Sequence, residues 1–489
     1  MHERQLCGCT HHPFNLPASA DIGAIVSVAM QAAVAGGHPA TVAAGVEILE
    51  DGGNAADAAV AASLASCVAE TVMTGLLGGG HAAYFEAATG RVRNLDCFVA
   101  VPGLGNELQD AELLHLDVPF GAELVHYAVG PASCGVPGLP AGLEALSLEH
   151  GRLPWRRLVE PALQLARDGV HFPPAHAACL AMLAPVMTMN EGAAIYAPGG
   201  ELLQAGDRLE QPGLVEALEA LADDAAAVYR GAIAAGLLGL SEERGGLLTH
   251  ADLDAYEPQW NDPVEVGYAG GRLVSRGGLS AIPETVPRLP RLHDLDETQR
   301  VLALLDAFGT PTDMRGDTTN VSVVDRDGNA CAFTSSLGLG SGDFIPGLDL
   351  HLNSMLGEAD LLHGRLEPGA RMQSMMAPLL AFDGDGLSLV GGAAGGTRLR
   401  TALLSVVAGI LDEGLAADVA VERPRLHAAP EVVNAEPGVD EAALEELEAR
   451  GLSVRRWPAR HHYFGGVSVV SRTGAAGDPR RSGAASTIR

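Results

Sequence analysis

An alanine-rich segment between Asn54 and Glu70 constrains the fold more than any other part of the chain. Its sequence, NAADAAVAASLASCVAE, starts with a residue type whose side chain caps helix N-termini and continues with small apolar residues on nearly every side. A surface helix carries a polar face, and this segment lacks a continuous one. We therefore predict a helix that is buried on all sides by the rest of the fold.

Helical spacing and strand-like runs alternate along the whole chain without a repeat period. A stretch rich in Gly, Pro and Arg, from about Tyr256 to Leu292, indicates an irregular surface segment or linker. The expected helices span 38–52, 54–70, stretches within 138–169 and 213–240, 295–309, 399–414 and 440–450, and the expected strands are a pair joined at Thr89-Gly90, a hairpin over 319–335 and a run at 465–471.

Composition excludes several classes of function. The chain has 61 acidic and 31 basic residues, a formal net charge of −30, and every basic residue is arginine. An acidic chain without a basic patch is not expected to bind nucleic acid or an anionic membrane surface. Mechanisms that need a lysine Schiff base, a lysine general base or a phosphate-loop lysine are excluded by the missing lysine.

Targeting and metal signals are weak. No apolar run reaches the roughly 18 residues of a membrane span, and the first twenty residues lack a secretory pattern, so a cytoplasmic protein is expected. The N-terminal group of Cys7, Cys9, His11 and His12 has two interpretations: a metal site, or a loose polar terminus. We favour the second and expect no metal, because a tetrahedral site usually needs two separated pairs of ligands.

The sequence Asp317-Thr318-Thr319 lies where a long polar loop meets an expected strand. An internal threonine is a poor nucleophile, but if the bond before it breaks, its new α-amine can serve as its own general base. For an isolated pair, two β-branched residues that begin a strand would be the better interpretation.

Eight separated motifs resemble the γ-glutamyltransferase family and reverse that preference. In the family's order they are GGNAADAAVAAS at 52–63, GLLGGGHAAYFEAATG at 75–90, GVPGLPAGLEAL at 135–146, DTTNVSVVDRDGNACAFTSS at 317–336, LNSMLGE at 352–358, PGARMQSMMAP at 368–378, GGAAGGTRLR at 391–400 and GDPRRSGAA at 477–485.

The resemblance implies an α/β (α+β) fold, the four-layer αββα sandwich of N-terminal-nucleophile hydrolases. It also implies a proenzyme, or zymogen, that cuts itself between Asp317 and Thr318. The products would be a large subunit, 1–317, and a small subunit, 318–489, which together form one catalytic domain as a heterodimer. No cofactor is implied, and pairing of heterodimers into a higher oligomer stays open.

Catalytic roles carry over by position. Thr318 corresponds to the autoprocessing residue and nucleophile, and Thr319 is the second member of the family's Thr-Thr pair. Ser336 occupies the position of a threonine whose hydroxyl contacts the nucleophile. Gly395 and Gly396 correspond to the glycines whose N–H groups form the oxyanion hole.

The expected substrate-binding positions depart from the family pattern. Phe98 replaces the arginine that pairs with the substrate's α-carboxylate, and Met355 replaces a glutamine. Glu358 stands for the aspartate that holds the α-amino group. Of a serine pair, Ser374 remains and Met375 replaces the other. Asn353 lies in the same motif as Met355 and is a further candidate for binding.

These changes indicate a less polar small-molecule substrate than a glutamyl compound. The bond could be an amide, or the activated carbon–carbon bond hydrolysed by relatives in antibiotic biosynthesis that make 4-alkylproline units. Arg371 or Arg398 could replace the missing arginine. Two alternatives stay open: an ordinary γ-glutamyl hydrolase or transpeptidase acting on glutathione-like compounds, and an uncut, non-catalytic binding protein. Whether water or an amine accepts the acyl group is also open.

Overall fold

Two β-sheets form the centre of the molecule. The computed structural model describes residues 30–106, 112–120, 123–309, 318–362 and 366–488. One sheet has seven strands, in the order β22 (Ala484–Thr487), β1 (Ala33–Gly36), β11 (Thr319–Val324), β12 (Ala330–Ser336), β2 (Gly79–Glu86), β3 (Arg91–Cys97) and β8 (Gln259–Asn261). The other has six, in the order β21 (Gly474–Gly477), β20 (Gly466–Ser471), β16 (Gly386–Ala394), β15 (Leu379–Asp383), β10 (Gly271–Ser275) and β9 (Val264–Tyr268).

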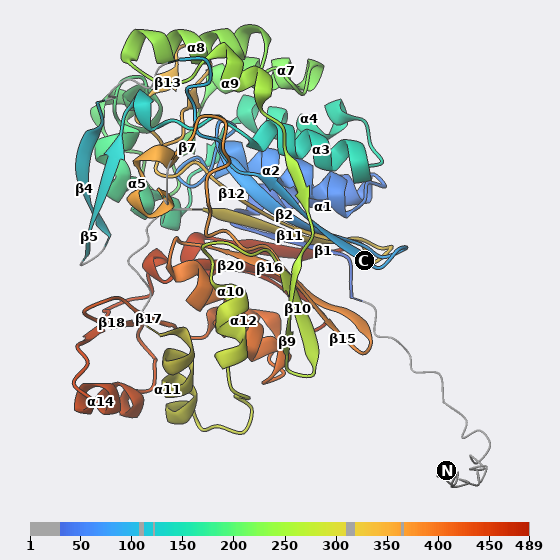
Figure 1. Ribbon diagram of the computed structural model, residues 1–489, viewed down its shortest axis with the longest axis vertical. Coiled ribbons are helices and arrows are strands. Elements are labelled where there is room, and N and C mark those ends of the chain that lie inside the picture. Colours follow the sequence, from blue (N-terminus) through green and yellow to red (C-terminus); the bar gives the residue numbers. More distant parts are fainter. Residues whose placement is uncertain (1–29, 107–111, 121–122, 310–317, 363–365, 489) are drawn as a thin grey trace, which may run out of the picture.

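Helices cover the outer face of each sheet, so the molecule has four layers (Figure 1). On the seven-stranded sheet lie α1 (Pro39–Glu50), α2 (Ala55–Ala69) and α3 (Leu139–His150), with α4 (Trp155–Asp168) packed on α2 and α7 (Pro212–Asp223) on α4. On the six-stranded sheet lie α10 (Ile282–Thr285), α12 (Arg398–Leu411) and α13 (Ala417–Glu422), and α11 (Glu297–Phe308) packs against α14 (Glu441–Ala449). The predicted αββα sandwich is confirmed.

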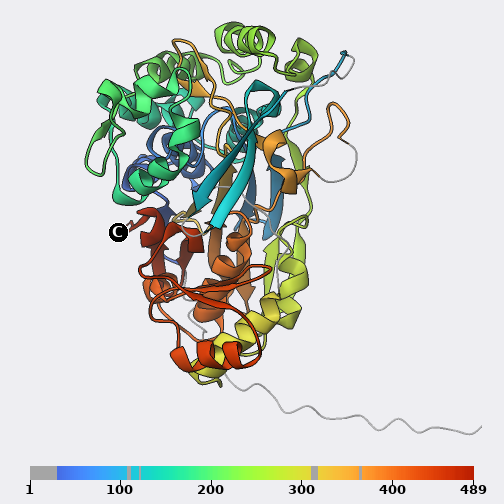
Figure 2. The same ribbon diagram turned by 90° about the vertical axis from the view of Figure 1, so that its left-hand side faces the viewer.

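Smaller elements surround these layers. The hairpin of β4 (Leu114–Phe120) and β5 (Glu123–Val129) faces the viewer in Figure 2. The others are α5 (Pro174–Met187), α6 (Gly192–Tyr196), α8 (Gly231–Arg244), α9 (His250–Ala255), the pairs β6 (Val170–His171) with β7 (Arg208–Leu209) and β13 (Phe344–Ile345) with β14 (Leu350–His351), and the sheet of β17 (Leu426–Ala428), β18 (Val433–Ala435) and β19 (Val454–Arg456). In the described part of the chain, no helix is both long and apolar enough to cross a membrane.

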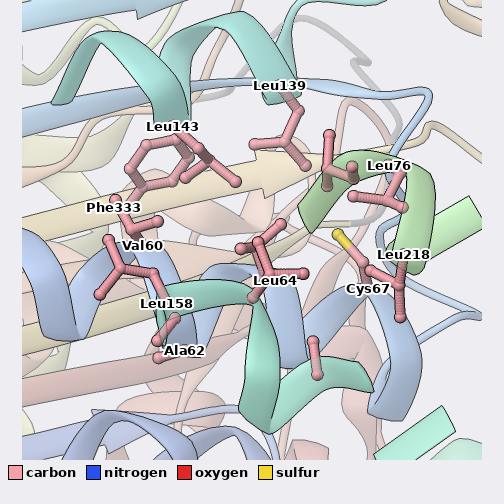
Figure 3. Close-up of a cluster of buried hydrophobic side chains, with 14 of the residues drawn as sticks. Val60, Ala62, Leu64, Cys67, Leu76, Leu139, Leu143, Leu158, Leu218 and Phe333 are labelled. Atoms are coloured by element: carbon pink, nitrogen blue, oxygen red, sulfur yellow. The ribbon is translucent and has the colours of Figure 1, made fainter. Parts of the chain in front are cut away.

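The buried alanine-rich helix is α2, as predicted, and every one of its residues is buried. Asn54 caps its N-terminus: the side-chain oxygen accepts hydrogen bonds from Ala56 N and Asp57 N, and Asp57 Oδ2 accepts one from Asn54 N. Small side chains let the neighbouring layers approach the helix closely. Figure 3 shows Val60, Ala62 and Leu64 of α2 among leucines of the surrounding helices and Phe333 of β12.

One sequence prediction was wrong. The segment from about Tyr256 to Leu292 is not a linker, because it supplies β8 to the first sheet and β9 and β10 to the second. Gly270, with φ of +81°, makes the turn between β9 and β10. On its other side β10 pairs with β15, which lies about a hundred residues later, and strand pairing at that distance leaves no local signal.

We expect Asn54→Ala to lower the free energy of unfolding by about 1–2 kcal/mol, because it removes a helix cap and leaves the His150 carbonyl without the donor Nδ2 of Asn54. The measurement is the midpoint of thermal unfolding by circular dichroism. Asp440→Ala removes the cap of the peripheral helix α14 and is the matched control. A loss for Asn54→Ala no larger than for the control would contradict the central role of α2.

Candidate active site

Thr318 immediately precedes β11, an interior strand of the seven-stranded sheet that lies between β1 and β12. In the pairing of β11 with β12, Thr319 lies opposite Ser335, and continuing that register places Thr318 opposite Ser336. Both residues are buried. The hairpin predicted from the sequence therefore brings the expected nucleophile and the expected hydroxyl partner to the same end of the sheet.

A cavity of about 300 Å³ opens at Thr318. It gathers residues from both halves of the chain, and most of the predicted site residues are among them. The lining residues are Phe98, Thr318, Ser336, Met355, Glu358, Leu361, Ser374, Met375, Met376, Gly396 and Leu399. Sequence reasoning missed Leu361, Met376 and Leu399, which look like ordinary core residues in the sequence.

Three predicted residues lie beside this cavity rather than in its wall. The Thr319 hydroxyl donates to Glu70 Oε2 at 2.5 Å. Asn353 braces two loops: its Oδ1 accepts from Gly135 N at 2.9 Å, and its Nδ2 donates to Gly135 O and Leu77 O at 2.8 Å. Gly395 precedes the wall residue Gly396. The predicted cleavage partner Asp317 lies outside the described residues.

Gly395 and Gly396 form the turn from β16 into α12. Their φ angles, +121° and +56°, fall in the region that favours glycine. A Cβ on Gly395 would lie 2.9 Å from the Gly465 Cα. Two successive glycines in this conformation can present backbone N–H groups toward a carbonyl oxygen bound in the cavity.

The cavity wall carries one acidic group and is otherwise mostly apolar. Glu358 is 5% exposed and lies between Met355 and Leu361 in the sequence of wall residues. Among the described residues that line the cavity, none is an arginine or a histidine.

Arginines near the cavity are engaged by the protein itself. The Arg371 guanidinium donates to Phe98 O and to Glu257 O and lies over the Tyr256 ring at 4.4 Å. Arg276 Nη1 donates to the carbonyls of Ser374 and Met376, each at 3.0 Å. Both guanidinium groups therefore bind main-chain carbonyls of residues in the cavity wall.

Arg398 and His81 also supply no cation to the cavity wall. Arg398 Nε donates to Tyr463 O at 3.1 Å, on the side of α12 that faces Tyr463. His81 stacks on Phe98 with 5.7 Å between ring centroids. Burial, together with the charges of Arg276 and Arg371, lowers the pKa of His81 well below its ordinary value, so its ring is neutral at pH 7. Arg371 and Arg398, the two residues that could replace the missing arginine according to the sequence, therefore make other contacts.

No cluster of three or more His, Cys, Asp or Glu side chains suited to a metal ion occurs within the described ranges. The group of Cys7, Cys9, His11 and His12 lies outside them.

If this turn is the oxyanion hole that the family resemblance implies, Gly395→Ala is expected to lower kcat on an amide substrate by about 10²-fold, because the added Cβ would displace the turn and its N–H groups. Gly391→Ala in β16 is the control. A Cβ there has its nearest neighbours at 3.4 Å, an ordinary contact, so kcat should stay within about twofold. Equal kcat values for the two variants would contradict an oxyanion role for this turn.

Known proteins resemble this chain along most of its length. The sequence profile of the family described as gamma-glutamyltranspeptidase matches residues 41–298 and 291–488. Over 519 residues, 93% of this chain and 90% of the relative, the chain is 27% identical to the Acylase ACY 1 proenzyme of Pseudomonas sp. (strain SE83). Over 493 residues, 84% of this chain and 83% of the relative, it is 27% identical to the glutathione hydrolase proenzyme of Escherichia coli (strain K12).

A solved structure has the same fold. The crystal structure of cephalosporin acylase from Bacillus halodurans superimposes with a TM-score of 0.79 at 22% identity, over 98% of this chain and 100% of that one. The family profile covers nearly all of the chain outside the first forty residues. The chain therefore belongs to the γ-glutamyltranspeptidase family, and it is a hydrolase or acyltransferase with the N-terminal-nucleophile fold.

Proposed function

We propose that this enzyme is a self-processed acyl hydrolase that uses Thr318 as its nucleophile and removes an apolar acyl group from a small molecule. One observation carries the proposal: the cavity at Thr318 has walls of Phe98, Met355 and Met375 and one carboxylate, Glu358. Such a wall suits a planar or aliphatic acyl group whose single polar function can donate a hydrogen bond to the carboxylate.

The reaction follows from the positions of these groups. After the chain is cut before Thr318, the free α-amine takes the proton from Thr318 Oγ as the oxygen attacks the substrate carbonyl. The N–H groups at Gly395 and Gly396 stabilise the negative charge that develops on the carbonyl oxygen. The leaving group takes up the proton, and water then attacks the acyl-enzyme and releases the acid.

A γ-glutamyl substrate fits this cavity poorly. Its α-carboxylate would lie near Phe98 and Glu358, while Arg371 and Arg276 donate to main-chain carbonyls outside the wall. A buried carboxylate without a cationic partner costs several kcal/mol.

The scissile bond is an amide or an activated carbon–carbon bond. Both need the same attack on a carbonyl and the same oxyanion site, so this geometry serves either. Similarity to proteins named acylases supports the amide. An apolar acyl group is also compatible with a role in antibiotic biosynthesis.

Ordinary γ-glutamyl hydrolysis or transpeptidation is the second candidate. Its support is Glu358, which lies in the cavity and could hold an α-amino group, together with similarity to glutathione hydrolases. In that case another group would have to bind the α-carboxylate.

Self-processing gives the first test. The purified protein is expected to separate on a denaturing gel into fragments 1–317 and 318–489, and the smaller one should begin with Thr-Thr-Asn by N-terminal sequencing. Thr318→Ala should stay as one chain, because it lacks the attacking hydroxyl, whereas Thr318→Ser should still be cut. A Thr318→Ala variant that is cut at this bond would contradict the assignment, and an uncut wild type would favour a non-catalytic binding protein.

Substrate preference gives the second test. The wild type is expected to hydrolyse phenylacetyl p-nitroanilide with a kcat/KM about 10²-fold above that for γ-glutamyl p-nitroanilide, since an unpaired carboxylate costs about 3 kcal/mol or more. Phe98→Arg should narrow this ratio by about tenfold or more, because it adds a cation to the wall.

Phe98→Leu keeps the wall apolar and is the control for this comparison. It should leave the preference for the phenylacetyl compound in place. A wild type that is faster on the γ-glutamyl compound would overturn the proposed substrate class in favour of the second candidate.

A further inference from the structure

A second cavity, of about 280 Å³, touches Thr318. Of the residues that the structure describes, Thr318 alone lines both this cavity and the substrate cavity, so it lies in the partition between them. The walls of the second cavity are buried and much more polar. They consist of Gly37, Glu70, Met73, His176, Thr318, Thr319, Asn320, Ala394, Gly466, Val467, Ser468, Asp478 and Arg481. We call this cavity the rear chamber.

Glu70 is the acidic group of the rear chamber that contacts the residue next to Thr318. It follows the last residue of α2 and is 1% exposed. Its Oε2 accepts a hydrogen bond from the Thr319 hydroxyl at 2.5 Å, and its Oε1 accepts one from the Thr41 hydroxyl at 2.6 Å. The carboxylate thus holds the residue bonded directly to Thr318.

Gly37 closes the chamber over this contact. A Cβ at that position would lie 2.1 Å from Glu70 Oε2 and 2.7 Å from the Thr319 hydroxyl oxygen. The chain at the end of β1 therefore approaches the Glu70–Thr319 hydrogen bond so closely that no side chain fits there.

Burying this carboxylate is costly. Burial raises the pKa of Glu70 to about 7, while the hydrogen bonds from Thr319 and Thr41 and the charge of Arg481 act in the opposite direction. The contact of Glu70 that caps α2 is made by its backbone N–H, which any residue could supply. The end of the helix therefore does not require a carboxylate at this position, and the carboxylate interacts instead with Thr41 and Thr319.

We propose that Glu70 is a positioning residue for Thr318. Through the Thr319 hydroxyl it fixes the backbone at the nucleophile, and its carboxylate stabilises the ammonium that the Thr318 α-amine becomes when it accepts the proton from Oγ. This role rests on the proposed function of Thr318 as an N-terminal nucleophile. It resembles the general case in which a buried carboxylate orients a catalytic base and stabilises its protonated form.

The rear chamber and its surroundings hold other charged or titratable groups besides Glu70. Arg481 faces Glu70 from the C-terminal segment, and its Nη1 lies 2.8 Å from Met73 Sδ. His176 on α5 is neutral, because burial lowers its pKa to about 3. The Asp478 carboxylate is bound by two buried arginines of its own. Burial raises the pKa of Cys67 on α2, which keeps the thiol neutral. Glu70 and Arg481 are therefore the charges that act on a Thr318 amine from this side.

The sign of the pH effect follows from these charges. A carboxylate near an amine favours the ammonium and raises the pKa of the amine, whose ordinary value is about 7.7–8.0. Replacing the carboxylate by an amide lowers that pKa. The rate rises with pH as the amine loses its proton and becomes available as a base, so in this variant the rise should occur at a lower pH. Because Glu70 itself titrates near neutrality, the wild-type profile reports the two groups as a coupled pair.

The test compares Glu70→Gln and Glu70→Asp with the wild type. Two rates are measured: self-cleavage on gels, and modification of the mature enzyme by phenylmethanesulfonyl fluoride, followed by the mass of the small fragment between pH 5 and 10. In this modification the Thr318 Oγ–sulfur bond forms, the hydroxyl proton passes to the α-amine, and fluoride leaves. The probe needs no knowledge of the substrate.

Glu70→Gln is expected to cut itself about tenfold more slowly, to react at high pH about tenfold more slowly, and to move the midpoint of the pH profile down by about half a unit or more. Glu70→Asp keeps the charge on a shorter arm, so it should slow both rates but leave the midpoint near that of the wild type. If Glu70→Gln stays uncut, a cut Glu70→Asp with the wild-type midpoint supports the proposal, and an uncut Glu70→Asp overturns it.

Two further results would overturn the role of Glu70: wild-type rates and midpoint in Glu70→Gln, or slower rates with an unmoved midpoint, which a purely structural residue would produce. A wild-type chain that never cuts itself contradicts the assignment of Thr318 instead. The two failures are thus distinguishable.

Discussion

The close packing of α2 against β11 and β12 is the contact on which the site depends. Alanine side chains along α2 let Val321, Val323 and Phe333 of the two strands pack directly against the helix. At one end of this contact the capping box of Asn54 and Asp57 fixes the helix start. At the other end Glu70 reaches Thr319 at the beginning of β11. The position of Thr318 therefore follows from a helix–sheet contact whose thickness is set by methyl groups, and a larger side chain in α2 would shift both ends.

Local signals explain which parts of the fold were predictable. The cap at Asn54, the turn between β11 and β12 and the glycines after β16 each act over a few residues, so the sequence alone indicates them. The strands β9 and β10 behave differently. They join the sheet through the pairing of β10 with β15, which a distant segment supplies, and their Gly- and Pro-rich surroundings resemble a loop. The family resemblance supplied the layer order, which no local pattern in this chain contains.

The candidate site, like the fold, could be predicted from the sequence only in part. Motifs placed Thr318, Ser336, Met355 and Glu358 in one cavity, because family positions carry over with the fold. Asn353 was expected at the substrate, yet its amide joins two loops of the scaffold. Residues such as Met376 and Leu399 could not be found this way, since an apolar residue in a cavity wall has the same sequence pattern as one in the core. Glu70 could have been suspected, because a carboxylate at the end of a fully buried helix must find a buried partner.

The distribution of charge around Thr318 is consistent with the less polar substrate that we propose. On the substrate side, Arg276 and Arg371 donate to backbone carbonyls behind the wall, so their positive charges hold the walls in shape instead of binding an anion. On the other side, Glu70 and Arg481 face the nucleophile within the rear chamber. On the proposed function, the groups that assist acyl transfer line the rear chamber and the glycine turn, and the groups that select the acyl chain line the substrate cavity. Among the described residues both cavities share Thr318, whereas Phe98 lines the substrate cavity and not the rear chamber, so we expect a change at Phe98 to leave the surroundings of Glu70 in place. This separation of the two cavities explains why the wall of the substrate cavity can be apolar although Thr318, Ser336 and the glycine turn occupy the positions expected of the family.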